Sequence, residues 1–407
     1  MPVLRFRGFT YAWERRKLGE LLLFQNGFNG SSESFGSGVP LISVMDVLDD
    51  EFITHETVRG KARLNCEEAS RYCVEYGDVL FQRSSENQED AGTSNVYLDQ
   101  HVSSAFGGFV IRGKKVGEYN PIFIKYLLGS SSIREQITHR AQGAQHINVS
   151  QDTLADVALL MPSMREQEAV GLVFLHLDSL VALHQRKLNK LHHIKKALLE
   201  KMFPTPDSNI PSIRFQGFTE AWKQQRLGEV ADIVGGGTPD TSNKAYWNGS
   251  IDWYSPAELG DQTYAIGSIR KITQAGYANC SAIMLPADKT ILFTSRAGIG
   301  NSAILRKPAC TNQGFQSLVV KDGTDVYFIY SMTGLIKKYA ERNASGSTFL
   351  EISGTSLAAG VFAFPSSAEE TAIGSVFNCL DSLVTLYQHK LNKLHCIKKA
   401  LLEKMFV

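Results

Sequence analysis

The sequence predicts an α+β fold in which two globular modules are separated by two long helices that pair as an antiparallel coiled coil, in a pseudo-two-fold tandem repeat. Three observations lead to this prediction. A motif near the N-terminus recurs in the middle of the chain, and a basic, leucine-spaced segment from the middle recurs near the C-terminus. Between these repeats, short β-rich runs alternate with helical patterns.

The internal repeat has two different spacings. "RFRGFTYAWERRKLGEL" at Arg5–Leu21 recurs 209 residues later as "RFQGFTEAWKQQRLGEV", whereas "LNKLHHIKKALLEKMF" recurs 203 residues later as "LNKLHCIKKALLEKMF". The smaller spacing already applies where "GAQHINVSQDTLADVALLMP" from Gly143 aligns with "GSTFLEISGTSLAAGVFAFP" from Gly346. The second copy is therefore six residues shorter than the first in the stretch that corresponds to Leu21–Gly143. The repeated motifs at the ends of each copy are alike, whereas the sequence between them differs in length and composition. This pattern predicts two exchangeable modules in one scaffold.

The repeated basic segment belongs to a long helix in each copy. Ser163-x-x-Glu166 and Ser366-x-x-Glu369 read as capping boxes, each directly after a proline. Apolar residues then recur with a period near 3.6, which favours a short helix pair over a long supercoil. About forty residues make a rod of roughly 60 Å. Two identical apolar stripes most simply bury each other, and the residues expected to pack between the helices or against a partner are Val170, Leu177, Val181, Leu188, Leu191, Ile194, Leu198, Ile373, Leu380, Val384, Leu391, Leu394, Ile397 and Leu401.

These signals divide the chain into five segments. We expect a first module at 1–160, a helix at 161–205, a linker at 206–213, a second module at 214–364 and a helix at 365–407. In each module, strand-like runs such as "YGDVLFQRS" and "DKTILFTSRAG" precede helical stretches.

Composition limits the class of protein. The 407 residues suffice for two to three domains, and a net charge of +1 neither demands nor excludes a nucleic-acid partner. No apolar run is long enough for a membrane span and no signal peptide is evident, so we expect a cytoplasmic protein with no membrane partner. The six cysteines form no C-x-x-C pair, and we expect them to be reduced and mostly buried, with no metal site.

No catalytic motif is complete. A G-x-x-x-x-G-K-[ST] sequence is missing, which excludes a P-loop ATPase. Asn120-Pro121-Ile122-Phe123 approaches the N/D-P-P-aromatic loop of adenine methyltransferases but lacks the second proline, and a helix start with proline in its first turn explains it better. "FGSG" at Phe35–Gly38 lies among serines and is weak evidence of a cofactor loop. We therefore predict no catalytic residues.

The remaining chemistry is that of binding. Gln82-Arg83-Ser84 and Thr294-Ser295-Arg296 follow strands at matching places in the two modules. Arginine can grip a guanine edge and glutamine an adenine edge, although either arginine could equally form a surface ion pair. The basic run from Arg186 to Lys201 could likewise be a solvated helix face or face a polyanion. The candidate DNA contacts at strand-to-loop junctions are Gln82, Arg83, Ser84, Gln145, His146, Thr238, Thr294, Ser295, Arg296, Asn312, Gln313 and Thr348.

These motifs together resemble one family. "RFxGFTxAWxxxxLGE", "PSMREQEAVGLVFLHLDSLVALHQRKLNKL", "GGGTPDTSNKAYWNGSIDWYSP", "TSRAGIGNSAIL" and "TNQGF" look like the DNA-specificity (S) subunits of type I restriction–modification systems, over essentially the whole chain. The Glu369-Glu370 pair departs from the Glu-Gln that relatives often carry. The resemblance implies a noncatalytic subunit with two target-recognition domains, each reading one half of a bipartite, asymmetric site on double-stranded DNA.

The resemblance also implies partners. Two methyltransferase (M) subunits would dock on the helices and supply S-adenosylmethionine chemistry, and motor-nuclease (R) subunits would bring ATP and Mg²⁺; this chain would bind no cofactor. Readers at the ends of a rod of roughly 60 Å reach sites at most about 17 base pairs apart. Two alternatives stay open: a self-sufficient DNA methyltransferase or restriction enzyme, and a coiled-coil adaptor that binds only proteins.

Overall fold

A computed structural model of the chain describes residues 2–143, 146–205, 208–260, 262–346 and 350–406. The chain forms two compact units. Unit 1 comprises Met1–Gln185 and Lys390–Val407, and unit 2 comprises Arg186–His389. The division falls inside the two long helices, so each unit holds one part of both.

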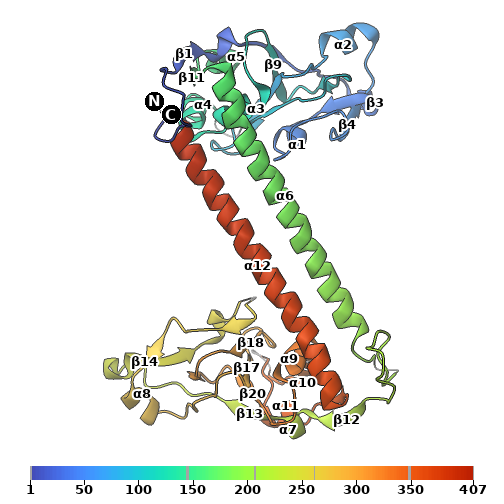
Figure 1. Cartoon of the computed structure of the whole chain (residues 1–407), viewed down its shortest axis with the longest axis vertical. Coiled ribbons are helices and arrows are strands. Elements are labelled where there is room, and N and C mark those ends of the chain that lie inside the picture. The colour runs from blue at the N-terminus through green and yellow to red at the C-terminus, as the bar shows by residue number, and fades with distance from the viewer. Residues whose placement is uncertain (1, 144–145, 206–207, 261, 347–349, 407) are drawn as a thin grey trace. The chain divides into compact units, whose positions relative to one another are not determined.

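A four-stranded antiparallel sheet forms the core of unit 1, in the order β2-β9-β5-β7. A second, three-stranded sheet has the order β4-β3-β8 and lies near α2 (Figure 1). The central strand β5 is buried throughout, as its apolar run predicts. The strands of unit 1 are β1 (Glu14–Lys17), β2 (Leu22–Asn26), β3 (Phe35–Ile42), β4 (Gly60–Ala62), β5 (Val79–Gln82), β6 (Ser84–Ser85), β7 (Ser94–Val96), β8 (Ala105–Phe106), β9 (Val110–Lys115), β10 (Ile147–Asn148) and β11 (Ala158–Met161).

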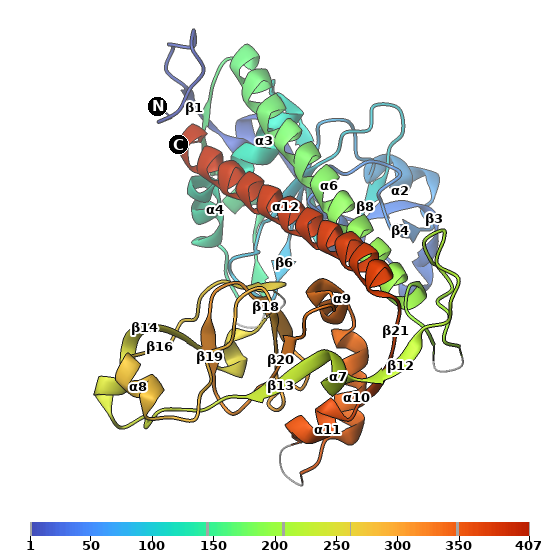
Figure 2. The same cartoon turned by 60° about the horizontal axis from the view of Figure 1, so that its bottom comes forward.

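Unit 2 repeats this arrangement. Its main sheet has the order β13-β20-β17-β18-β15, and a separate sheet β16-β14-β19 lies beside α8 (Figure 2). The strands of unit 2 are β12 (Lys223–Arg226), β13 (Ala231–Gly235), β14 (Trp247–Tyr254), β15 (Tyr264–Ala265), β16 (Lys271–Ile272), β17 (Thr290–Phe293), β18 (Ser302–Leu305), β19 (Ala309–Thr311), β20 (Gln316–Val320) and β21 (Val361–Phe364).

The two units share most of their topology, although the main sheet of unit 2 has one more strand, β15, and unit 1 has an additional strand pair, β6 with β10. In both small sheets the central strand pairs antiparallel on one side, with a register shift, and parallel on the other. In both units an N-terminal strand pairs with the strand that leads into a long helix, β1 with β11 and β12 with β21. The predicted tandem repeat of α+β modules is therefore confirmed. The shorter helices of unit 1 are η1 (Leu18–Glu20), η2 (Ser32–Ser34), α1 (Val44–Val47), α2 (Cys66–Arg71), α3 (Pro121–Leu128), α4 (Ser131–Thr138) and α5 (Gln151–Ala155).

Asn120-Pro121 begins a helix, as expected. The Asn120 side chain accepts hydrogen bonds from the amides of Ile122 and Phe123 at 3.0 Å, and Pro121 occupies the first turn of α3. The shorter helices of unit 2 are α7 (Leu227–Val230), η3 (Lys244–Tyr246), η4 (Pro256–Glu258), α8 (Gln274–Ala278), α9 (Val326–Ser331), α10 (Thr333–Asn343) and α11 (Gly354–Ala358).

The two long helices are α6 (Met164–Lys201) and α12 (Ser367–Met405), with 38 and 39 residues. They pair antiparallel in each unit. In unit 1, Lys398 near the end of α12 forms an ion pair with Asp178 near the start of α6, at 2.5 Å. In unit 2, the corresponding Lys195 and Asp381 form the same pair.

A tyrosine completes each of these ion pairs. The Tyr126 hydroxyl donates to Asp178 at 2.8 Å, and the Tyr327 hydroxyl donates to Asp381 at 2.7 Å. The two tyrosines do not occupy corresponding positions, because Tyr126 lies six residues after the N-cap Asn120 and Tyr327 two residues after the N-cap Asp325. Each module thus reaches the same helix carboxylate from a different turn of its own helix.

Most of the apolar positions expected to pack along α6 and α12 are covered. Ile194 and Ile397 differ, because their exposed fractions are 38% and 39%. The fully buried members of the set are Val170, Leu188, Ile373 and Leu391, and the half-buried members are Leu177, Val181, Leu191, Leu198, Leu380, Val384, Leu394 and Leu401. Ile194 and Ile397 occupy corresponding positions in the repeat, so both copies of the long helix expose an isoleucine at the same place.

The predicted capping boxes are half present. Ser163 Oγ accepts from the Glu166 amide at 3.4 Å, and Ser366 does the same for Glu369. The glutamate side chain, however, does not turn back to the helix start. The Glu166 carboxylate receives two hydrogen bonds from Arg5, at 2.6 and 2.7 Å, and Glu369 receives the same pair from Arg214. A buried bidentate ion pair outcompetes the local cap.

The expectation that the cysteines are mostly buried is wrong. Cys310 is buried, but Cys66, Cys379 and Cys396 are exposed and the other two are half-buried. Cys379 and Cys396 lie on outward-facing positions of α12, where the repeat pattern does not require an apolar side chain. All six cysteines are free thiols.

Candidate nucleic-acid interface

The predicted Gln82-Arg83-Ser84 stretch of unit 1 follows the buried strand β5. Gln82 is itself buried, and its Nε2 donates to the Ser84 carbonyl at 2.9 Å. Arg83 is half-buried, and its guanidinium reaches only the Gly108 carbonyl, at 3.4 Å. Ser84 donates to the Asn148 side chain, because β6 pairs with β10. The backbone is therefore held tightly while the Arg83 head remains available.

A polar pocket of about 420 Å³ surrounds Arg83. Its other side chains are mostly amides and hydroxyls, contributed by Asn26, Gln142, Asn148, Ser150 and Gln151. Such groups both donate and accept hydrogen bonds, which suits the edges of DNA bases. Of the two other unit 1 candidates, His146 is exposed beside this pocket and its carbonyl accepts from Asn148 at 3.1 Å, whereas Gln145 lies outside the described residues.

In unit 2, the predicted Thr294-Ser295-Arg296 stretch follows β17. Thr294 and Ser295 are fully buried. The Thr294 hydroxyl donates to the Gly298 carbonyl at 2.6 Å and accepts from the Asn301 amide at 2.9 Å. These bonds close a tight loop in which Ala297 and Gly298 have positive φ of 53° and 100°. Burial assigns Thr294 and Ser295 to shaping this loop, and Gln82 to the same role in unit 1.

Arg296 is the side chain that this loop presents. It lies 3.7 Å from Glu351, with exposed fractions of 42% and 41% for the two side chains. An exposed ion pair of this length contributes little, so the guanidinium can exchange its partner for a ligand at small cost. Glu351 also accepts a hydrogen bond from Ser295 Oγ at 3.4 Å. The arrangement corresponds to unit 1, where Asn148 occupies the position of Glu351 in the repeat.

Three loops of unit 2 meet beside Arg296. Thr238 donates to the Gln313 side chain at 2.5 Å, and the Ser295 amide donates to the Gly314 carbonyl at 2.8 Å. Gly236 is required here, because a Cβ would lie 2.2 Å from two backbone oxygens. Asn312 and Thr238 are partly exposed and Gln313 is exposed. The structure thus gathers all the unit 2 candidates except Thr348, which lies outside the described residues.

Sequence reasoning missed Asn26, Gln142, Asn148 and Glu351. The alignment of "GAQHINVS" with "GSTFLEIS" already placed Asn148 and Glu351 at one repeat position. What it could not show was the pairing of β10 with β6, which brings Asn148 to Ser84. Within the described ranges, no three His, Cys, Asp or Glu side chains are grouped to hold a metal ion, and no helix is long and apolar enough to cross a membrane.

Comparison with known proteins shows what the chain is similar to. The model of the type I restriction modification DNA specificity domain matches residues 219–395. The type I restriction enzyme MjaIX specificity subunit of Methanocaldococcus jannaschii is 35% identical over 167 residues, which are 40% of this chain and 38% of that protein. A putative MjaX specificity subunit of the same organism is 21% identical over 96% of this chain and 92% of its own length. Residues 219–395 of this chain thus match the type I DNA specificity domain, and the chain as a whole is similar to type I specificity subunits.

Solved structures agree on the fold of these specificity subunits. A type I restriction–modification S subunit from M. genitalium superposes with a TM-score of 0.64 at 15% identity, covering 100% of this chain and 99% of that one. A chain from a structure describing complex assembly and conformational transition of the type I system gives a TM-score of 0.53 at 18% identity, covering 97% and 98%. The α+β fold with two long helices is therefore that of S subunits.

Proposed function

We propose that this chain reads a bipartite, asymmetric sequence on double-stranded DNA for a type I restriction–modification complex, and that it catalyses no reaction itself. The observation that carries the proposal is the repeated frame with unlike reading loops. Both units have closely similar sheets and the same ion pair between the long helices, yet one presents Arg83 among amides and the other presents Arg296 beside Glu351. Unlike loops in like frames would read unlike half-sites.

The long helices would set the distance between the half-sites. A helix of 38 residues is about 57 Å long. The antiparallel ion pairs Lys398–Asp178 and Lys195–Asp381 hold its partner in one register. Because such a pair resists sliding, the spacer length would become part of the recognised sequence.

The same helices would dock two methyltransferase subunits. Unit 1 exposes Leu183 and Ile397 on its helix segments, at 44% and 39%, and unit 2 exposes Leu386 and Ile194, at 46% and 38%. These are corresponding positions of the repeat, so the chain offers the same apolar pair twice. Covered by two identical subunits, both pairs would leave water. S-adenosylmethionine would then belong to those subunits, and ATP with Mg²⁺ to motor-nuclease subunits.

The test is to co-express the chain with its methyltransferase partner and to map N6-methyladenine across the host genome. One two-part motif with a fixed spacer is expected. Arg83→Ala should relax the first half only and Arg296→Ala the second half only, each by about 5- to 150-fold, since one arginine–base contact discriminates by about 1–3 kcal/mol. Each variant is the matched control for the other.

Other outcomes would identify the alternatives. Methylation by the purified chain alone would show a self-sufficient enzyme. Methylation that is unchanged when the chain is left out would favour a protein-only adaptor. Relaxation of both halves by either single variant would contradict the assignment of one half-site to each unit.

A further inference from the structure

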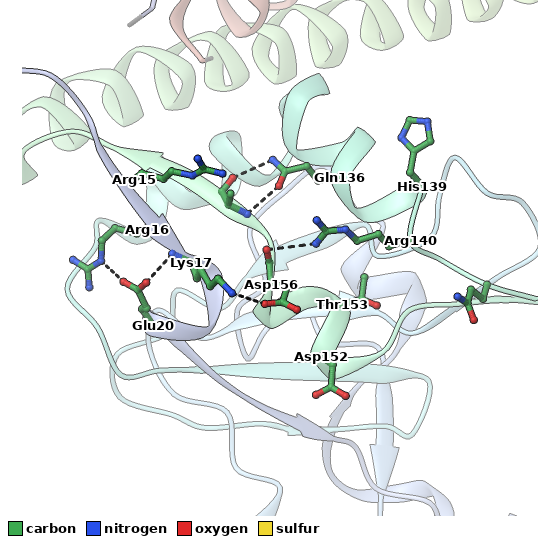
Figure 3. Close-up of a pocket in the computed structure, with 12 residues that line it drawn as sticks. Arg15, Arg16, Lys17, Glu20, Gln136, His139, Arg140, Asp152, Thr153 and Asp156 are labelled. Carbon is green, nitrogen blue, oxygen red and sulfur yellow. Dashed lines mark hydrogen bonds and ion pairs between the residues drawn. The ribbon is translucent and has the colours of Figure 1, made fainter.

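Unit 1 contains a second, larger polar groove beside the strand pair β1–β11. It has a volume of about 930 Å³ and is walled by β1, α5 and the end of α4 (Figure 3). Arg15, Arg16 and Lys17 line it from β1, and His139 and Arg140 from the segment after α4. We call it the Arg15 groove.

The acidic side chains in the Arg15 groove are largely neutralised by their neighbours. Glu20 accepts from Arg16 at 2.5 Å, and Asp156 accepts from Lys17 at 2.7 Å. These bonds lower the pKa of both carboxyls, so both stay ionised and paired. Asp152 is the one other carboxylate in the groove.

Two guanidinium groups remain available. Arg140 donates only to the carbonyl of Asp156, at the long distance of 3.4 Å, and Arg15 forms no ion pair or hydrogen bond with any described residue. Both side chains are exposed. After internal pairing, the groove therefore has two free positive charges against one negative charge.

In unit 2, two of the cations that line this groove are replaced by neutral residues. Gln224 and Asn343 stand at the positions of Arg15 and Arg140 in the repeat. Tyr339 stands at the position of Gln136 and fills the space, because its hydroxyl donates to the Ser356 carbonyl at 3.0 Å and its ring packs on Phe362 at 5.7 Å. The two arginines that give the groove its excess positive charge are thus present in unit 1 and replaced at the matching positions of unit 2.

The Arg15 groove adjoins the pocket around Arg83. Gln142 lines both, and Gln151 of the Arg83 pocket directly precedes Asp152 of the groove. A strand of DNA whose bases meet Arg83 would have its adjoining phosphates within reach of this surface. Arginine and backbone groups that follow a duplex in this way position it without reading sequence.

We propose that the Arg15 groove holds the DNA backbone that adjoins the first half-site, through Arg15 and Arg140, so that unit 1 contacts phosphates that unit 2 does not contact at the matching positions. The inference rests on the proposed DNA reading. It favours DNA over an acidic segment of a partner protein, because the groove adjoins the candidate reading pocket.

The test compares wild type with Arg15→Gln/Arg140→Gln, each as the full chain co-purified with its methyltransferase partner. Binding is measured on a duplex carrying the mapped motif, between 50 and 200 mM salt. Two lost phosphate contacts reduce the salt slope by about 1.8, so wild type should lose about 12-fold more affinity than the variant over this range. Gln224→Ala/Asn343→Ala, at the matching positions of unit 2, should behave as wild type, and Arg15→Lys/Arg140→Lys should restore the slope.

An unchanged salt slope overturns the proposal, and so does loss of the methyltransferase subunit with DNA binding retained, which would assign the groove to a protein partner. Failure of wild type to bind the motif would instead refute the DNA reading itself.

Discussion

At Glu370 the two copies of the frame differ in charge at the same buried place. It is 5% exposed, and its Oε2 accepts from the Asp325 amide at 3.1 Å. Gln167 stands there in unit 1, accepting from the Asn120 amide and donating to the Pro162 carbonyl, both at 2.9 Å. An ionised carboxylate can accept a bond but cannot donate one. Burial, with a smaller repulsion from Asp325, raises the pKa of Glu370 from 4.5 to about 7.

This raised pKa makes the stability of unit 2 dependent on pH. Between about pH 4.5 and 7 the folded state holds a proton that the unfolded state has released, so the free energy of unfolding falls as pH rises through this window. Above pH 7 the whole cost of ionising a buried carboxyl is present, roughly 3 kcal/mol by this shift. Glu370→Gln removes that cost, because the amide is neutral at every pH.

We expect Glu370→Gln to raise the Tm by about 6–12 °C at pH 8, since a unit of this size shifts by about 2–4 °C per kcal/mol. At pH 5 the gain should shrink to below about 1 kcal/mol. The assay is differential scanning calorimetry of the full chain between pH 5 and 8. The matched control is Gln167→Glu, which should introduce the same pH-dependent loss into unit 1. An equal gain at pH 5 and pH 8, or no gain at pH 8, would refute the reasoning.

Two further predictions concern the long helices. Inserting seven residues into both α6 and α12 adds about 10.5 Å to each helix. The spacer of the methylated motif should therefore lengthen by up to about 3 base pairs, while both half-sites stay unchanged. Methylome sequencing checks this, and an unchanged spacer would contradict the idea that the helices set the spacer length. Ile194→Ser or Ile397→Ser should each weaken one methyltransferase site by about 10-fold or more, and the double variant both sites. Native mass spectrometry should then show one bound methyltransferase subunit for each single variant and none for the double variant. Leu23→Ser, at another exposed leucine, is the control and should keep two bound subunits.

The fold could be predicted because the repeat made each local signal appear twice. Strand runs, helix starts and the period of the long helices agree between the copies, and local patterns of this kind survive into the tertiary structure. The capping boxes were wrong in part for the opposite reason. The partner of Glu166 is Arg5, 161 residues away, and no local rule ranks a distant bidentate arginine above a nearby amide.

The sequence could predict which candidate residues follow a strand. It could not predict in which direction their side chains point. Arg83 and Arg296 lie at strand-to-loop junctions, where the sequence pattern placed them, and their guanidinium groups make only weak contacts with the described residues. The neighbouring Thr294 is buried, because a loop with three positive φ angles needs its hydroxyl for internal bonds. Whether a polar side chain faces the ligand or supports the loop depends on backbone geometry that residue type alone does not carry.

The attachment of the N-terminal motif has a topological consequence. The Leu4 amide donates to the Lys404 carbonyl at 2.9 Å, and the Ile213 amide donates to the Lys201 carbonyl at the same distance. One bond joins the start of the first copy to the end of α12, and the other joins the start of the second copy to the end of α6. The two copies are therefore joined by the same backbone hydrogen bond at two places. At one of them, between Lys201 and Ile213, the chain itself also runs from the first copy into the second. A gene that joined Lys404 to Leu4 and opened the chain between Lys201 and Ile213 would encode the same set of contacts. Under the proposed function, the order of the two units in the chain could then change while the recognised DNA would stay the same.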